Sequence, residues 1–504
     1  MHLQIVIAYA LLIWWPRERP FDPLLVSGIG AAVVVLALLG LVAVTARWAC
    51  VRAMDRLARG ASGGNRPCHR HHVHLTLLNG ICLLAFVAEV ALTGWADSVA
   101  SVSIIATVPG MTGLVTIGPY LAGLILVFLL NYPVDRVLRD RAAGVAALDG
   151  FPPRAVWTLR AYMEFNVRHH VLTVVVPMTL ILAGYDVAHI YEGDLERLLG
   201  VPWAPDIALG AAAVGVFIMS PWLLRHIWMT HRLPDGALRN ELNAFCERIG
   251  LKFREILVWE SDGMVANAAV MGVAGPLRYV LLSDGLIRAL SPRHIEAVFA
   301  HESGHIRHKH IQYFLLFAAA SMLVSSGAME LAYRWLGTAG PAAETREIAT
   351  QGVGMVSIIA FWTLGFGFVS RRFERQADLF GARQVAALSD AQCAVPCGVH
   401  HGQADGGPAR PGLCATGVRV FVEALESVAA LNGIPRDEFS WRHGSIAIRT
   451  RFLTSLSGDP GRLSRFERNI RGIKAALVIV CAGGTIAGTV YLWPLINKVA
   501  ARVW

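Results

Sequence analysis

Long apolar segments separated by polar loops dominate the pattern of this chain. A transmembrane helix needs about 20 mostly apolar residues, because the hydrocarbon core of a bilayer is about 30 Å thick. Eight segments meet this requirement. The shorter apolar segment 2–15 lacks the basic start and cleavage site of a signal peptide and is counted as a ninth transmembrane helix. The eight longer segments are residues 23–46, 75–95, 117–132, 171–190, 205–228, 311–332, 351–369 and 475–496.

The composition supports a membrane protein. Hydrophobic residues make up 55% of the 504 positions and charged residues only 16%. Soluble domains carry about 25% charged residues, so this chain lacks the polar surface that water requires. An ordinary soluble enzyme, a disordered chain and a disulfide scaffold are excluded. The eight cysteines show no paired framework, which favours a reducing compartment.

The distribution of basic residues predicts the orientation. The net charge is +9, and arginines are concentrated in the loops after the first and third long spans. The alternate loops are poor in base: 96–116 has no lysine or arginine, and 191–204 has only Arg197. Since basic loops stay on the cytoplasmic side, segments 229–310 and 371–474 are predicted to face the cytoplasm. The basic surplus is thereby assigned to membrane loops, and no nucleic-acid partner is expected.

One short motif carries metal chemistry. The helix predicted over 293–310 contains His301-Glu302-Ser303-Gly304-His305, an HExxH sequence. Residues four apart share a helix face, so both imidazoles can bind one ion, with Glu302 beside it to take a proton from bound water. Zn²⁺ suits neutral imidazole ligands. The alternative is a surface helix with two solvated histidines.

A catalytic zinc site needs a third protein ligand on the same membrane face. Two spans follow the HExxH helix, so the chain returns to that face near Ser370. Glu374 and Asp378 stand there, four residues apart on a predicted helix. One carboxylate can bind zinc while the other accepts a hydrogen bond from a ligating histidine. The alternative is a solvated charged turn after a span.

The two cytoplasmic segments are the places for a soluble domain. The first contains strand-like runs at 256–259, 265–273 and 279–283. We therefore predict a mainly α, polytopic membrane protein of about nine transmembrane helices, with a small α+β zincin-like catalytic domain formed from two cytoplasmic segments. The predicted parts are an N-terminal membrane region 1–228, a catalytic segment 229–310, a transmembrane hairpin 311–370, a second catalytic segment 371–474 with an inserted loop 390–417, and a C-terminal span 475–504.

These motifs resemble a known family. An HExxH helix, a membrane hairpin and then the sequence SRRFERQADLFGA at 370–382 are similar to the integral-membrane zinc metalloproteases that include HtpX and the type I CAAX prenyl endopeptidases. Residues 267–272 resemble the strand that precedes the HExxH helix in this family. Residues 441–446 resemble its late H-P-x-x-x-x-R element, with Gly444 in place of the usual proline. The resemblance covers about half of the chain.

The resemblance implies a gluzincin-type protease with one zinc ion per chain. Its ligands would be His301, His305 and Glu374, and Glu302 would be the general base. Asp378 would support the ligands from behind.

The resemblance also implies roles around the substrate. His443 would stabilise the oxyanion of the tetrahedral intermediate, and Arg449 would order Asp378 or bind a substrate carboxylate or carbonyl. Asn267, Ala268 and Gly272 would belong to a strand that pairs with the substrate backbone. The alternative for this strand is an ordinary core position.

Together these observations predict a multi-pass zinc endopeptidase of a cell membrane, expected to be the bacterial inner membrane. Its substrates would be peptides or membrane-associated proteins, cleaved by zinc-activated water with Glu302 as base. One alternative is a CAAX-type processing protease for lipidated C-termini. Another is a membrane sensor or signalling protein with a zinc domain and little proteolysis. The sequence predicts no oligomeric state.

Two further polar features of the sequence lie outside the predicted zinc site. Glu89 lies within a predicted span, where carboxylates are costly and tend to be functional. The inserted loop has a spacing of cysteines and histidines that suits a structural zinc, although its glycine and proline content fits a disordered insertion equally well. These residues are Cys393, Cys397, His400, His401 and Cys414.

Overall fold

The chain divides into two compact units. Unit 1 comprises Met1–Arg232, Leu257–Val265 and Ser283–Gly285, and unit 2 comprises Leu233–Ile256, Ala266–Leu282 and Leu286–Trp504. The computed structural model describes residues 2–14, 28–59, 66–148, 156–201, 203–339, 342–387, 413–457 and 459–503.

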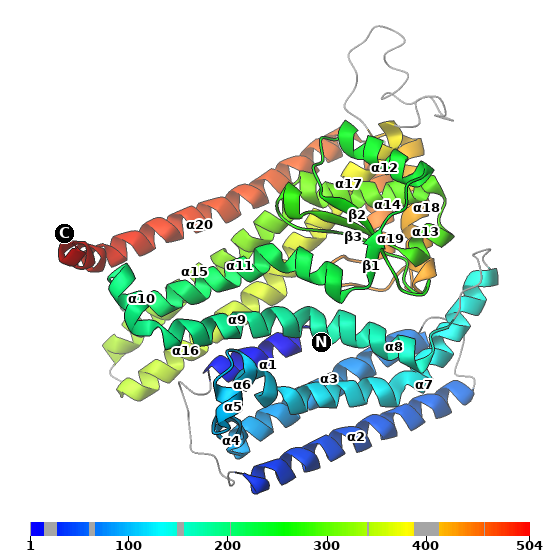
Figure 1. The fold of residues 1–504 in the computed structure, drawn as a ribbon. Helices are drawn as coiled ribbons and strands as arrows, with labels where there is room; N and C mark the ends of the chain where they lie inside the picture. Colours follow the sequence, from blue (N-terminus) through cyan, green and yellow to red (C-terminus); the bar gives the residue numbers. More distant parts are fainter. Residues whose placement is uncertain are drawn as a thin grey trace. The chain divides into compact units, whose positions relative to one another are not determined.

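Unit 1 consists almost wholly of helices (Figure 1). The long helices α2, α3 and α7 pack against one another, and α9 packs against α11. The elements are α1 (His2–Trp14), α2 (Ile29–Ala58), α3 (Arg66–Leu92), α4 (Trp95–Ala100), α5 (Ser103–Ala106), α6 (Met111–Thr116), α7 (Gly118–Leu148), α8 (Leu159–Asn166), the π-helix η1 (Val167–Leu172), α9 (Thr173–Ile190), α10 (Glu192–Leu199), α11 (Ala204–Ile227) and the strand β1 (Thr230–Arg232).

Eight helical segments of the described chain are long and apolar enough to cross a membrane, judged by length and composition. Each overlaps one of the eight longer apolar segments predicted from the sequence. The protein is therefore a mainly α, polytopic membrane protein. The segments are Ile29–Ala58, Val73–Leu92, Gly118–Gly144, Leu159–Ile190, Ala204–Ile227, His310–Thr338, Ala343–Ala386 and Pro460–Val490.

The ninth predicted span is the helix α1, which has 13 residues. At 1.5 Å per residue it is about 20 Å long, shorter than the hydrocarbon core of a bilayer. Its apolar side chains instead serve packing: Ile5, Ala8 and Tyr9 are fully buried. The Tyr9 hydroxyl also lies 2.9 Å from the Thr179 hydroxyl on α9. Among the described residues, the predicted count of nine is thus corrected to eight.

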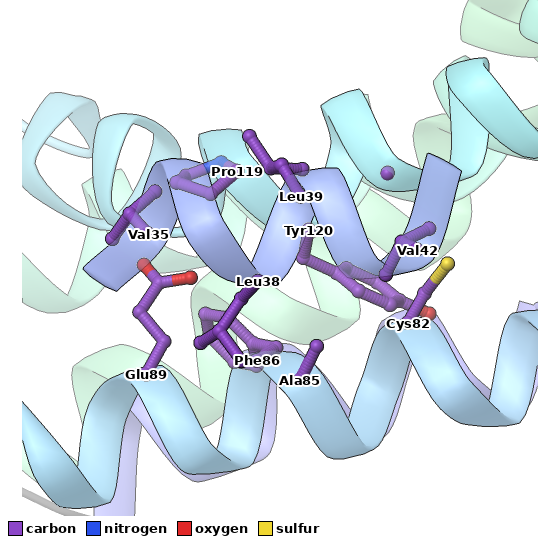
Figure 2. Close-up of a pocket in the computed structure, with 11 residues that line it drawn as sticks. Val35, Leu38, Leu39, Val42, Cys82, Ala85, Phe86, Glu89, Pro119 and Tyr120 are labelled. Carbon is purple, nitrogen blue, oxygen red and sulfur yellow. The ribbon is translucent and has the colours of Figure 1, made fainter. Parts of the chain in front are cut away.

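Glu89 lies inside unit 1, on α3. Its side chain lines a cavity of about 10 Å³ together with Cys82, Phe86 and Tyr120 (Figure 2). The residue is 3% exposed, and its Oε1 atom has no hydrogen-bond partner among the described residues. A cavity of this size is about the smallest that holds one water molecule. Glu89 is therefore a buried carboxyl group among apolar helices.

The remaining elements belong mostly to unit 2 and include a short sheet followed by helices (Figure 1). They are α12 (Ala237–Arg248), β2 (Glu255–Trp259), β3 (Ala268–Met271), the 3₁₀-helix η2 (Gly275–Leu277), β4 (Tyr279–Ser283), α13 (Asp284–Ala289), α14 (Pro292–Arg307), α15 (His310–Ala339), α16 (Ala343–Ala360), the π-helix η3 (Phe361–Phe366), α17 (Gly367–Ala387), α18 (Ala415–Leu431), α19 (Ile446–Leu456) and α20 (Pro460–Val503).

The four strands form one sheet in the order β1-β2-β4-β3. β3 pairs antiparallel with β4, with Ala268 opposite Leu282 and Met271 opposite Tyr279. β3 is therefore an edge strand. The sequence predicted β2, β3 and β4 but missed β1, because three residues are too few to show an alternating pattern.

The HExxH helix α14 has a defined start and an abrupt end. The Ser291 hydroxyl accepts a hydrogen bond from the His294 backbone N–H, and Pro292 occupies the first helical position. The predicted helix 293–310 is nevertheless broken, because Lys309 adopts a left-handed backbone conformation with φ of 57°. α15 begins at the next residue, His310.

The segment 371–474, predicted to be the second catalytic segment, begins within a long helical run through α16, η3 and α17. The apolar helix of this run spans 44 residues, or about 66 Å, which is twice the thickness of a hydrocarbon core. Its C-terminal part therefore extends beyond a bilayer that the apolar part crosses. The predicted insertion 390–417 lies mainly outside the described residues. Its last residues were wrongly predicted as loop, since α18 begins at Ala415.

Candidate metal centre and active site

Close packing between α14 and α17 builds the site. A Cβ atom on Gly304 would lie 3.0 Å from the Cα atom of Ala377, so a side chain at this position would force the two helices apart. The glycine of the HExxH sequence therefore lets α17 approach the face of α14 that carries the histidines. Both helices belong to unit 2.

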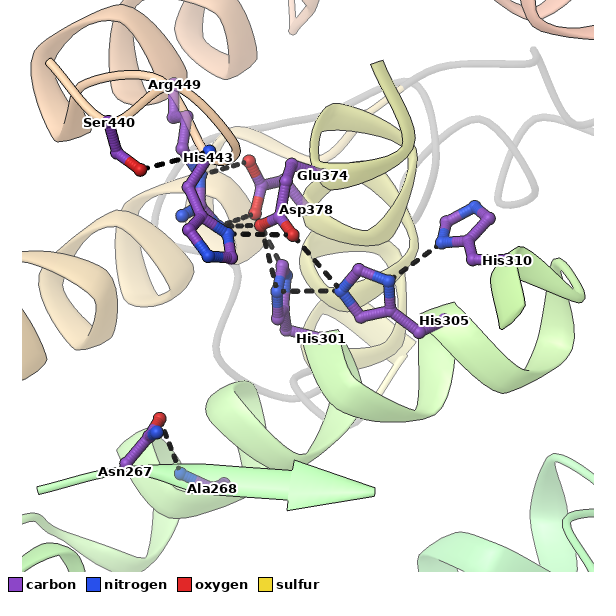
Figure 3. A network of polar contacts seen from close by, with 10 residues as sticks. All are labelled: Asn267, Ala268, His301, His305, His310, Glu374, Asp378, Ser440, His443 and Arg449. Carbon is purple, nitrogen blue, oxygen red and sulfur yellow. Dashed lines mark hydrogen bonds and ion pairs between the residues drawn. The ribbon is translucent and has the colours of Figure 1, made fainter. Parts of the chain in front are cut away.

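Three potential metal-binding side chains meet at this contact (Figure 3). Nε2 of His301 lies 3.3 Å from Nε2 of His305. The Glu374 carboxylate faces both rings, with Oε2 at 3.6 Å from His301 Nε2 and Oε1 at 3.7 Å from His305 Nε2. Glu374 reaches this point from α17, although 69 residues of sequence separate it from His305.

The donor set fits a zinc ion. Two imidazole nitrogens and one carboxylate oxygen lie within 4.8 Å of one another, and this is a group that could hold a metal. A tetrahedral zinc ion with bonds of about 2.0–2.2 Å separates its ligand atoms by roughly 3.3–3.6 Å, close to the distances between these side chains. Three protein ligands leave a fourth position for water or substrate.

Asp378 and Arg449 support this cluster from behind. Asp378 is fully buried, and its Oδ1 lies 3.0 Å from Nδ1 of His301, on the ring side away from Glu374. Arg449 from α19 donates two hydrogen bonds to the Asp378 carboxylate, from Nε at 2.9 Å and from a terminal nitrogen at 2.5 Å. Of the two roles expected for Arg449, this geometry favours the ordering of Asp378.

His443 lies at the exposed side of the cluster, where its Nδ1 is 3.0 Å from Glu374 Oε1. In this arrangement the imidazole of His443 contacts Glu374, which is itself a candidate metal ligand. The next residue, Gly444, has a φ of 75°. Proline, which fixes φ near −65°, cannot adopt this conformation, so the turn differs from the H-P turn of the family that the sequence resembles.

A cavity of about 310 Å³ opens in front of the cluster. Glu302 lines it together with the three potential ligands and His443. One wall is apolar and comes from α14, α15 and α18. These residues are Val298, Phe314, Phe421, Ala424, Leu425 and Val428.

The edge strand β3 begins beside this cavity. Asn267 lines the cavity and its side-chain oxygen accepts a hydrogen bond from the Ala268 backbone N–H. Asn432, at the end of α18, holds the preceding residue: it donates to the Ala266 carbonyl at 2.7 Å and accepts from the Ala266 N–H at 3.2 Å. Gly272 ends the strand with a φ of 101°. The strand predicted to receive substrate is thus tied in place next to the site.

Burial and charge shift the pKa values of the HExxH residues. Burial raises the pKa of Glu302 to about 7, although the neighbouring His301 charge opposes this shift. Burial and the charge of His301 lower the pKa of His305 to about 4. For His301, burial lowers the pKa, but Asp378 and Glu374 raise it overall. His305 is therefore a neutral imidazole at pH 7, the form that binds metal.

Sequence reasoning missed three residues of this region: His310, Gln376 and Asn432. His310 Nδ1 lies 2.8 Å from His305 Nδ1, and its Nε2 lies 3.0 Å from Gln376 Oε1. Gln376 had a signal, because it stands between Glu374 and Asp378 in the same motif. His310 and Asn432 had no such signal in the sequence. The left-handed conformation of Lys309 positions His310, and Asn432 contacts Ala266, which lies 166 residues away in the sequence.

Comparison with known proteins agrees with this geometry. Residues 232–396 match the model of the family described as "Peptidase family M48". The match contains the HExxH helix, the membrane hairpin and Glu374. The matched segment, about one third of the chain, is similar to peptidase family M48.

Curated relatives of this chain are named "Protease HtpX homolog". The Aeropyrum pernix protein is 28% identical over 221 residues, which are 39% of this chain and 66% of that protein. The Thermoplasma acidophilum protein is 27% identical over 113 residues, or 21% of this chain and 35% of that protein. This chain thus spans between about one third and two thirds of the length of these relatives.

A solved structure also aligns with this chain. It is titled "Crystal Structure of S. mikatae Ste24p" and has 15% sequence identity. The alignment covers 86% of this chain and 100% of that chain, with a TM-score of 0.44.

Proposed function

We propose that this protein is a membrane-embedded zinc endopeptidase. The observation that carries the proposal is the convergence of His301, His305 and Glu374 on one point beside Glu302, at the wall of a cavity of about 310 Å³. The family model that spans this segment supports the proposal. One zinc ion per chain is expected.

The side chains divide the chemistry among them. Bound zinc supplies a Lewis acid that polarises the scissile carbonyl and lowers the pKa of water. Glu302 takes the proton of the attacking water and returns it to the leaving amine. Asp378, held by Arg449, keeps the His301 ring oriented so that its Nε2 faces the cavity.

The substrate is expected to lie between β3 and α14. β3 ends the strand order of the described sheet, and an extended peptide can add to such an edge strand. His443, which lines the cavity, is proposed to stabilise negative charge that develops on the carbonyl oxygen. Substrates would be peptides or membrane proteins presented near the bilayer, with the catalytic segments on the cytoplasmic side.

Two alternatives are retained. Processing of lipidated C-termini would use the same zinc chemistry, and the apolar cavity wall could contact a lipid chain. A zinc-domain sensor with little proteolysis would hold the metal without turnover, but Glu302 beside the cluster favours an enzyme.

The proposal is tested by metal removal and return. Protein purified in detergent micelles is stripped with a chelator, dialysed and reloaded with one equivalent of Zn²⁺. We expect cleavage of casein and of model peptides to disappear on stripping and to return on reloading. Cleavage that persists in metal-free protein would reject a zinc mechanism. Zinc binding without cleavage of any peptide, lipidated or not, would favour the sensor.

A further inference from the structure

His310 stands directly behind His305. The side chain is fully buried, and its Nδ1 lies 2.8 Å from Nδ1 of His305 (Figure 3). Its other nitrogen, Nε2, lies 3.0 Å from Oε1 of Gln376 on α17. The ring is stacked on Phe373, with 4.4 Å between ring centroids and 6° between the planes. Both nitrogens and one face of His310 are therefore engaged.

These contacts select one arrangement of protons if His305 Nε2 binds zinc. That nitrogen must present a lone pair to the metal, so the proton of the neutral ring sits on Nδ1. His305 Nδ1–H then donates to His310 Nδ1, which must be an acceptor. His310 accordingly carries its proton on Nε2 and donates to the Gln376 side-chain oxygen. The opposite arrangement would place a proton on His305 Nε2 and exclude the metal.

The backbone is arranged for this contact. An ordinary continuation of α14 would carry residue 310 onward along the helix. Instead, α14 ends at Arg307, Lys309 takes a left-handed conformation with φ of 57°, and α15 starts at His310. A side chain with a Cβ atom pays about 1 kcal/mol for this conformation, so the surrounding packing must hold it there. The break turns His310 back toward His305.

The two candidate zinc ligands on α14 thus have different supports. His301 is held by the Asp378 carboxylate, which itself pairs with Arg449. His305 is held by a neutral imidazole and a neutral amide. Metal-bound histidines usually donate their second N–H to a carboxylate, a carbonyl or water, and loss of such a partner weakens metal binding.

We propose that His310 is a positioning residue for the metal site, fixing the orientation and proton arrangement of His305, and that Gln376 fixes His310 in turn. This inference rests on the proposed function, because it requires zinc at His305 Nε2. It assigns to the helix break after α14 a role in metal binding.

The proposal is tested by the zinc affinity of the full-length protein in detergent. This affinity is measured by competition with a chromophoric chelator. Replacing His310 with phenylalanine keeps a buried ring on Phe373 but removes the acceptor. We expect His310→Phe to bind Zn²⁺ about 10- to 100-fold more weakly than wild type. His310→Asn, whose side-chain oxygen can accept the bond, should recover most of this loss. The matched control is His294→Phe, which removes an imidazole at the start of α14, where its Nε2 lies 3.8 Å from Glu423, and should bind zinc as wild type does.

The outcomes separate this inference from the proposed function. If wild type binds no zinc, the proposed function fails. If wild type binds zinc and His310→Phe binds it equally well, the role of His310 alone is rejected. If His310→Phe does not fold, the Gln376 variants decide. Gln376→Met should weaken zinc binding and Gln376→Glu, which retains an acceptor, should not; equal affinities of these two variants would also reject the proposal.

Discussion

Replacement of Glu302 by glutamine is expected to abolish hydrolysis while leaving the metal in place. The amide has nearly the same shape but cannot accept the proton of the attacking water. General acid–base catalysis of this kind contributes about 10²- to 10⁴-fold, so kcat should fall within that range or below detection. Glu302 is not one of the three converging potential ligands, so zinc content should stay at the wild-type level. Peptide cleavage and metal content of the same preparations measure both quantities.

The pH dependence of wild-type activity provides a second test of the role of Glu302. Burial raises the pKa of Glu302 to about 7 in the metal-free protein, and a nearby cation would lower it. Since the base acts only when deprotonated, kcat/KM of wild type should rise with pH and level off at or below about pH 7. Full activity of Glu302→Gln, or a wild-type rate that keeps rising well above neutral pH, would contradict the role of Glu302.

Replacement of Arg449 by methionine is expected to cause a large loss of stability. Arg449 and Asp378 are 6% and 0% exposed and form a two-point ion pair. Removing one partner of a buried pair leaves an uncompensated charge and costs about 3–5 kcal/mol. The free energy of unfolding, from denaturation in detergent micelles, measures this loss. Zinc affinity should fall as well, because Asp378 no longer holds His301 in a fixed orientation.

A matched variant on the same helix controls for the loss of an arginine as such. Arg451 also lies on α19, but it is exposed, and its Nε donates to the Ala447 carbonyl at 3.2 Å. Arg451→Met should change the free energy of unfolding by no more than about 0.5 kcal/mol. Equal effects of Arg449→Met and Arg451→Met would show that the buried pair does not stabilise the site.

Much of this architecture is readable from local sequence patterns. Eight spans follow from apolar length alone, because a membrane imposes one requirement on every crossing helix. The start of α14 is encoded by Ser291 and Pro292, and β4 by a run of apolar residues. The pairing of Glu374 with the HExxH helix follows from the even number of spans between them. Each of these features is determined either by residues that are close in sequence or by the membrane face to which a segment returns.

Features that depend on contacts distant in sequence could not be predicted. The end of α14 is decided by the conformation of Lys309, a residue that ordinarily favours helix. α1 has the apolar character of a span but buries its side chains against α3 and α9 instead. Gly444 stands where the family pattern has proline, and its positive φ gives a turn that proline cannot form. For α1, packing rather than the apolar character of the segment determines the outcome.

The most direct test of the central claim is X-ray absorption at the zinc edge on full-length protein loaded with one equivalent of Zn²⁺. A site made by His301, His305 and Glu374 predicts only nitrogen and oxygen ligands, at about 2.0–2.2 Å, with the scattering signature of two imidazole rings. Sulfur ligands at about 2.3 Å would instead place the zinc on cysteines such as those of the 390–417 segment and would contradict the proposed active site.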